Sequence, residues 1–157
     1  MFILVRAATY ATLFVGFFLV ALPARVLSAS GVSAPTAMGI WQAVGLAVGA
    51  CGAAMALACI ITFVFEGGGT PAPFDPPRRL VAKGPYAVLR NPMYLGAAVA
   101  MGGAAVFYQS VGLLGYVAAF LIATHFFVVA YEEPTLGRTF GRDYEIYRQK
   151  VRRWWIA

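Results

Sequence analysis

Charged side chains are scarce in this sequence. Only 11% of its 157 residues are charged, 61% are hydrophobic, and the mean hydropathy is +0.77. A soluble domain has about one-quarter charged and about half apolar residues. The composition therefore excludes an ordinary soluble domain and predicts an integral membrane protein with a single domain, residues 1–157.

Cysteine and histidine are scarce as well. The sequence has two cysteines, Cys51 and Cys59, and one histidine, His125, with no thiol-pair or ligand-cluster spacing, so we expect no metal site. It also has no Ser-His-Asp set, no P-loop and no dinucleotide glycine fingerprint after a strand. These absences disfavour hydrolysis, phosphoryl transfer and a Rossmann-bound cofactor.

Long hydrophobic runs are abundant. A membrane span needs about 20 apolar residues, and the runs that suit one are 3–22, 38–65, 93–108 and 111–131. Between the second and third runs, the Gly- and Pro-rich residues 66–92 predict a loop. We expect an all-α membrane protein with about four transmembrane helices. Residues 7–24 also have some features of a signal peptide, but the single Arg6 is a weak basic region, so we expect this segment to be retained.

The basic residues are distributed asymmetrically. Of the twelve Lys and Arg residues, all but Arg25 lie near the start of the first run (Arg6), in the 66–92 loop or after the last run. The positive-inside rule then makes both termini and this loop cytoplasmic. The basic charge is explained by topology and by attraction to anionic lipid, so we expect contact with the lipid bilayer and no nucleic acid partner.

The segment after Tyr131 predicts a C-terminal amphipathic interfacial helix, residues 132–155. Apolar and aromatic residues recur there at intervals of three or four, as on one face of a helix. They are Leu136, Phe140, Tyr144, Tyr147, Val151 and Trp154. A basic helix with such a stripe is typical of the headgroup boundary, where Trp154 and Trp155 suit the interfacial belt.

Three groups of residues are candidates for chemistry. Segment 84–96 combines prolines, glycines, tyrosines and Arg90 beside a membrane run, where irregular backbone is tolerated only if protein or a polar cavity covers it. Glu132 and Glu133 stand where the C-terminal helix is expected to begin, either as solvated helix N-terminal charges or as ligands for a cationic or hydroxyl-rich group. His125 is either a functional intramembrane residue or a satisfied buried histidine.

The order of two motifs resembles a known family. The first is Gly84-Pro85-Tyr86 with Arg90-Asn91-Pro92-Met93-Tyr94-Leu95-Gly96, and the second is Glu132-Glu133-Pro134-Thr135-Leu136 with Phe140-Gly141-Arg142-Asp143-Tyr144-Glu145-Ile146-Tyr147. Together they resemble the integral-membrane methyltransferases that act on isoprenylcysteine carboxylates and phospholipid amines. The resemblance covers roughly residues 71–155.

The resemblance implies an S-adenosylmethionine pocket at the cytoplasmic membrane surface. The residues that it assigns to this cofactor are Tyr86, Arg90, Asn91, Pro92, Tyr94, Gly96, Glu132, Glu133, Tyr144 and Tyr147. Carboxyl-methylating members usually have histidine where this chain has Asn91, which leaves the acceptor open between a lipid amine, a prenyl-cysteine-like carboxylate and a small hydrophobic thiol or amine.

The expected reaction is an in-line methyl displacement that requires alignment rather than a metal. Tyr86 or Tyr94 would hold the sulfonium by cation–π contact. Arg90 or Arg153 would orient a carboxylate acceptor, whereas Glu133 or His125 would take the proton from an ammonium. Two alternatives are a nicotinamide-dependent membrane reductase and a non-catalytic membrane subunit. A homo-oligomer is also compatible with the sequence.

Overall fold

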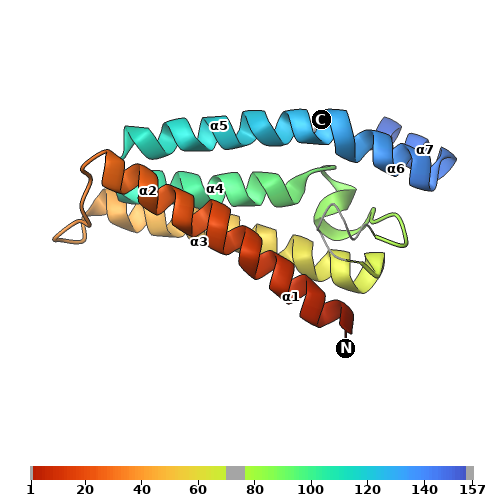
Figure 1. Ribbon diagram of the computed structural model, residues 1–157, viewed down its shortest axis with the longest axis horizontal. Coiled ribbons are helices and arrows are strands. Elements are labelled where there is room, and N and C mark those ends of the chain that lie inside the picture. The colour runs from red at the N-terminus through yellow and green to blue at the C-terminus, as the bar shows by residue number, and fades with distance from the viewer. Residues whose placement is uncertain (1, 70–76, 155–157) are drawn as a thin grey trace.

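The computed structural model describes residues 2–69 and 77–154, which form a bundle of long helices (Figure 1). The first helix is α1 (Phe2–Phe14), which continues through the π-helical turn η1 (Val15–Ala21) into α2 (Leu22–Ala29). The remaining elements are α3 (Ile40–Thr62) with its π-helical end η2 (Phe63–Gly67), the 3-10 turn η3 (Gly84–Ala87), α4 (Pro92–Phe107), α5 (Val111–Phe127), the π-helical turn η4 (Val128–Glu132), α6 (Glu133–Phe140) and α7 (Arg142–Lys150).

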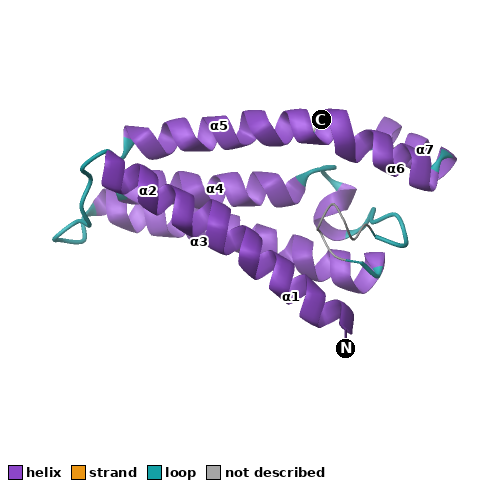
Figure 2. Cartoon of the chain, in the orientation of Figure 1, coloured by secondary structure: helices purple, strands orange, loops and turns teal. Residues whose placement is uncertain are grey.

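The expected all-α membrane fold is confirmed. The described residues form helices and loops with no strand (Figure 2). Three helical stretches are long and apolar enough to cross a membrane: Val5–Ala29, Ile40–Gly67 and Val111–Phe140. The remaining expected span, Pro92–Phe107, is a shorter apolar helix. Residues 70–76 of the expected 66–92 loop lie outside the described part of the chain.

Glycines bring α3 and α4 into close contact. A Cβ atom on Gly45 would lie 2.5 Å from the backbone nitrogen of Phe107, and one on Gly96 would lie 2.9 Å from that of Ala56. Gly103 of α4 meets the backbone of Gly49 in the same way. Such small residues drive helix association in membranes, where backbones gain by approaching closely. The Gly45-xxx-Gly49 pattern therefore serves packing within the bundle.

The C-terminal region differs from the single helix expected over 132–155. The helix of α5 continues through η4 and α6, so Glu132 and Glu133 lie inside a helix and do not begin one. Gly141, with φ of 50°, ends α6, a backbone conformation that residues with a side chain rarely adopt. After α7, Val151 is extended and Arg152 forms a β-bridge, and residue 155 lies outside the described part. The proposed apolar stripe is divided accordingly, and Tyr144 and Tyr147 are buried.

Candidate functional site

Three distant segments meet at one end of the bundle. They are the stretch that follows η3, the junction of η4 with α6, and residues 151–154 after α7. Figure 1 shows α6, α7 and the loop before α4 at this end. Leu89 pairs with Arg152 in a parallel bridge, and the backbone N–H of Arg90 donates to the Arg152 carbonyl at 2.9 Å. The chain folds back on itself here, so that Arg90 and Arg153 lie on the same side of the bundle.

Arg90, Glu133 and Arg153 form an ion-pair cluster. Arg153 donates to Glu133 from Nε to Oε1 at 2.7 Å and from Nη2 to Oε2 at 2.8 Å, while Nη1 of Arg90 lies 3.0 Å from Oε1. The side chains of Arg90 and Glu133 are each only 11% exposed. A carboxylate removed from water in this way is stable only when it is paired with cations in good geometry. Two guanidinium groups share one carboxylate, so the cluster carries a surplus positive charge.

Glu132 has a different partner. Successive residues of a helix point about 100° apart, so Glu132 faces α4 while Glu133 faces the arginines. The Tyr94 hydroxyl donates to Oε2 of Glu132 at 3.2 Å. The two adjacent carboxylates are thereby separated into two environments, one beside a phenol and one beside two cations.

Tyrosines from α7 and from η3 lie next to the arginine cluster. Tyr144 places its hydroxyl 3.4 Å from Nη1 of Arg90, and the Tyr147 hydroxyl donates to the Tyr86 carbonyl at 2.7 Å. Burial raises the pKa of Tyr86, of Tyr144 and of Tyr147 above the ordinary tyrosine value. All three side chains therefore stay uncharged phenols at neutral pH. The Tyr86 ring itself packs against Cys59 and Val81.

Asn91, Pro92 and Gly96 make contacts that position the start of α4. Asn91 is buried and donates from Nδ2 to the Arg153 carbonyl at 3.4 Å, which helps to fix the extended C-terminal segment. Pro92 occupies the first turn of α4, where a missing N–H costs nothing. Gly96 lies one turn further on and faces the backbone of α3. These residues set the start of α4 and hence the position of Arg90 and Tyr94.

His125 has a partner that the spacing along the chain did not suggest. The indole Nε1 of Trp154 donates to Nδ1 of His125 at 3.0 Å. This contact connects α5 to the extended segment that carries Arg153. His125 thus lies next to the segment that carries Arg153, and its hydrogen bond goes to Trp154 and not to Glu133.

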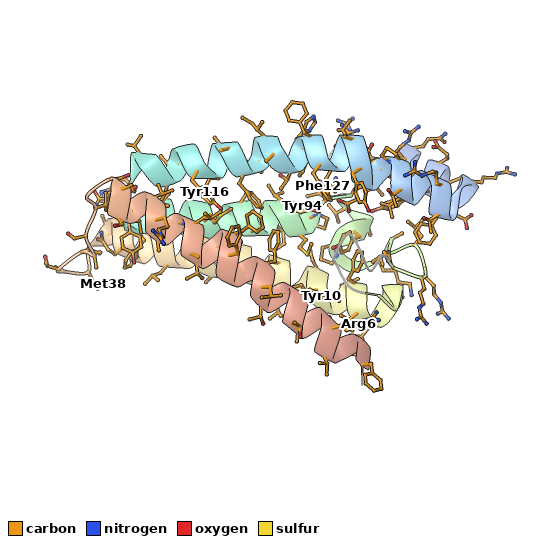
Figure 3. The ribbon with its side chains drawn as sticks, in the orientation of Figure 1. Arg6, Tyr10, Met38, Tyr94, Tyr116 and Phe127 are labelled. Carbon is orange, nitrogen blue, oxygen red and sulfur yellow. The ribbon has the colours of Figure 1, made fainter. Side chains whose placement is uncertain are left out.

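An apolar cavity of about 570 Å³ opens beside Tyr94, between the first helix and α3, α4 and α5. Figure 3 shows Tyr10 on α1 across from Tyr94 and Phe127. The lining is almost wholly hydrocarbon and aromatic, and the hydroxyl of its Thr124 is already bonded to the Phe120 carbonyl at 2.9 Å. Cavities of about 300–1,000 Å³ are typical of small-molecule sites.

The contribution of the first helix to this cavity was missed by the sequence analysis. Tyr10, Phe14 and Phe18 all line it. Their spacing of four residues within an apolar run was the available signal, because it places three aromatic rings on one side of a helix.

One family model matches the chain. It is described as phospholipid methyltransferase and covers residues 40–143, from the start of α3 to the first turn of α7. No curated protein and no solved structure matches. The matched range holds the first motif and the second motif as far as Asp143, whereas Tyr144, Tyr147 and the Arg153 segment lie beyond it. The chain therefore belongs to the phospholipid methyltransferase family, which implies methyl transfer to a lipid-related substrate.

Proposed function

We propose that this protein transfers a methyl group from S-adenosylmethionine to a membrane-embedded acceptor, a lipid headgroup amine or a prenyl-cysteine-like carboxylate, at the cytoplasmic membrane face. The observation that carries the proposal is the double role of Tyr94. Its hydroxyl bonds to Glu132 and its side chain lines the apolar cavity. A hydrophobic acceptor and the charged groups of a site would meet at this residue.

The side chains present fit the cofactor. Nε of Arg90 is buried with no hydrogen-bond partner among the described residues, and a buried donor left unpaired is costly. The surplus positive charge of the arginine cluster suits a carboxylate, and the carboxylate of Glu133 suits an ammonium or ribose hydroxyls. We therefore assign the cofactor to Arg90, Glu133, Arg153 and Tyr144.

When bound, S-adenosylmethionine supplies an electrophilic methyl carbon on a sulfonium. The acceptor nitrogen or oxygen would supply the electron pair of the new bond, and the sulfonium would leave as a neutral thioether. Alignment at near-attack distance is the main contribution of the protein. The Tyr94 ring can stabilise positive charge by cation–π contact, an effect on the order of 1–2 kcal/mol where water is excluded.

An amine acceptor must also lose a proton. Arg153 occupies both oxygens of Glu133, and Nδ1 of His125 accepts from Trp154. Glu132, by contrast, accepts through Oε2 from Tyr94, whose side chain lines the cavity. We assign the proton-accepting role to Glu132 in place of the two residues that the sequence suggested.

The cytoplasmic orientation is supported by the charge distribution. The arginine cluster lies at the same end of the bundle as the basic residues of α6 and α7, such as Arg138 and Arg142 (Figure 1). The positive-inside rule assigns that end to the cytoplasm.

Calorimetric titration of purified protein with S-adenosylmethionine tests the proposal. We expect saturable binding by the wild type, its loss in Arg90→Ala, and wild-type binding in Arg142→Ala, which removes an exposed arginine of α7. Incubation with total membrane lipid and mass spectrometry would then identify the methylated acceptor. Absence of binding at millimolar cofactor, in protein shown by circular dichroism to be folded, would refute the assignment.

A further inference from the structure

The walls of the apolar cavity come from two parts of the chain, one inside the range that the family model matches and one outside it. Ala97 of α4 and Phe120 of α5 belong to the range that the family model matches, whereas Tyr10, Phe14 and Phe18 belong to the first helix, outside that range. The first helix therefore supplies one wall of a cavity whose other walls are family core. We propose that the cavity receives a single aliphatic chain of the acceptor and that the first helix selects which chain fits. This inference rests on the proposed function.

The polar end of the cavity is defined by Tyr94. A chain that enters there has its head beside the Tyr94–Glu132 hydrogen bond and its tail among Ala97, Phe14 and Phe120. Along the first helix, the lining extends from Tyr10 to Leu19. Nine residues of helix at 1.5 Å each rise about 14 Å. The cavity thus extends from the level of the site toward the membrane interior, as an elongated chain requires.

Aromatic rings delimit the inner end. The Phe14 and Phe18 rings have centroids 4.9 Å apart, and Phe14 meets the Phe120 ring edge-on at 6.4 Å. These rings come from both the first helix and α5. They form a floor whose position limits how far a chain can reach.

The floor is held in place by a specific bond. In the π-helical register of η1, the carbonyl of Phe18 would accept from the residue five positions later, which is Pro23 and has no N–H. The Tyr116 hydroxyl of α5 donates to this carbonyl instead, at 2.8 Å. An unpaired carbonyl is costly inside a membrane, so this bond fixes the first helix against α5 at the level of Phe18.

The bilayer explains why such a cavity selects chains and does not merely attract them. Lipid tails are as apolar as leucine, so a chain that moves from the bilayer into the cavity gains little from the hydrophobic effect. The fit of the chain to the cavity walls therefore decides which acceptors are bound. Substitutions that change the floor or the width of the cavity should change which acceptor chain is preferred, without changing the affinity for the cofactor.

Photo-crosslinking of purified protein in nanodiscs tests the inference without methyl transfer. The probes are single-chain phosphoethanolamine lipids of graded chain length with a diazirine at the chain end, and labelled residues are mapped by mass spectrometry. We expect long chains to label Phe18 and Phe120. Ala11→Phe, which fills the cavity from α1, should lower this labelling about tenfold, and Phe18→Ala should shift the preference to longer chains.

Two control substitutions lie on the same helix but outside the lining. Ala8→Phe adds the same ring at an exposed position, and Phe17→Ala removes a ring that is 55% exposed. Both variants should show the same crosslinking pattern as the wild type. If Ala11→Phe fails to fold, Ala123→Phe fills the cavity from α5 and must give the same loss.

The inference is overturned if labels spread evenly over lipid-facing residues such as Val111, or if neither filling variant lowers labelling at Phe18 and Phe120. Cofactor titration of the same variants separates the two proposals. A wild type that binds no S-adenosylmethionine refutes the proposed function, whereas chain-length-dependent labelling would still establish the cavity as a chain site.

Discussion

Arg153 donates two hydrogen bonds to the carboxylate of Glu133, 20 residues earlier in the chain, at 2.7 and 2.8 Å. The bidentate geometry satisfies both oxygens of a carboxylate that has little access to water. Arg90 completes the arrangement from the other motif. This relationship makes the C-terminal extended segment part of the site and leads to the first prediction.

Arg153→Ala should weaken cofactor binding and lower stability. Arg153 is 30% exposed, so the loss in unfolding free energy should be about 1–2 kcal/mol, below the value for a fully buried pair. Arg153→Lys cannot reproduce the two parallel hydrogen bonds of the guanidinium group, so it should recover only part of the lost affinity and stability. Thermal unfolding in detergent and cofactor titration measure both effects. Wild-type affinity in Arg153→Ala would contradict the role of the cluster.

Glu132→Gln should lower kcat for an amine acceptor by about 10²–10⁴-fold, the usual contribution of a positioned base. The amide keeps the size of the side chain and can still accept from Tyr94, so folding and cofactor affinity should be retained. Tyr94→Phe keeps the ring and should lose less activity. Steady-state kinetics with lipid vesicles make the comparison; an equal loss of cofactor affinity in Glu132→Gln would show that Glu132 binds the cofactor instead.

Gly103→Ala should destabilise the bundle by about 1–3 kcal/mol, because the new methyl group would meet the backbone of Gly49 on α3. Gly102→Ala is the matched control on the same helix, since a Cβ there has nothing within 4 Å. Thermal unfolding of both variants in one detergent is the measurement. Similar melting temperatures for the two variants would contradict the packing role of the glycines.

The tyrosines make stability sensitive to alkaline pH. Burial raises the pKa of Tyr86 and of Tyr147 in the folded protein above the unfolded value of about 10. The folded state keeps these protons where the unfolded state loses them, so their contribution is complete below about pH 10 and declines as pH rises above it. Tyr147→Phe should flatten this decline. Melting temperature measured against pH reports the slope, and an unchanged slope would contradict the prediction.

The sequence predicted the all-α membrane fold and the two motifs that meet at the cluster. Apolar runs and turn residues carry that information locally. The environments of Glu132 and Glu133 could not be predicted, because they depend on the helix continuing through both residues and on Gly141 turning α7 back toward Arg90. The aromatic wall of the cavity had a signal in the spacing of Tyr10, Phe14 and Phe18. The cavity itself could not be predicted, since the angle at which the first helix crosses α5 depends on tertiary contacts such as the bond from Tyr116 to the Phe18 carbonyl.

The pairing of Leu89 with Arg152 also fixes an order of events during synthesis. Arg90 leaves the ribosome before Glu133, so one of the two cationic partners of this carboxylate is synthesised before it. Arg153 emerges later, after α6 and α7. Because Arg153 supplies two of the bonds to Glu133, the arginine cluster is completed only after α3, α4 and α5 have been translated.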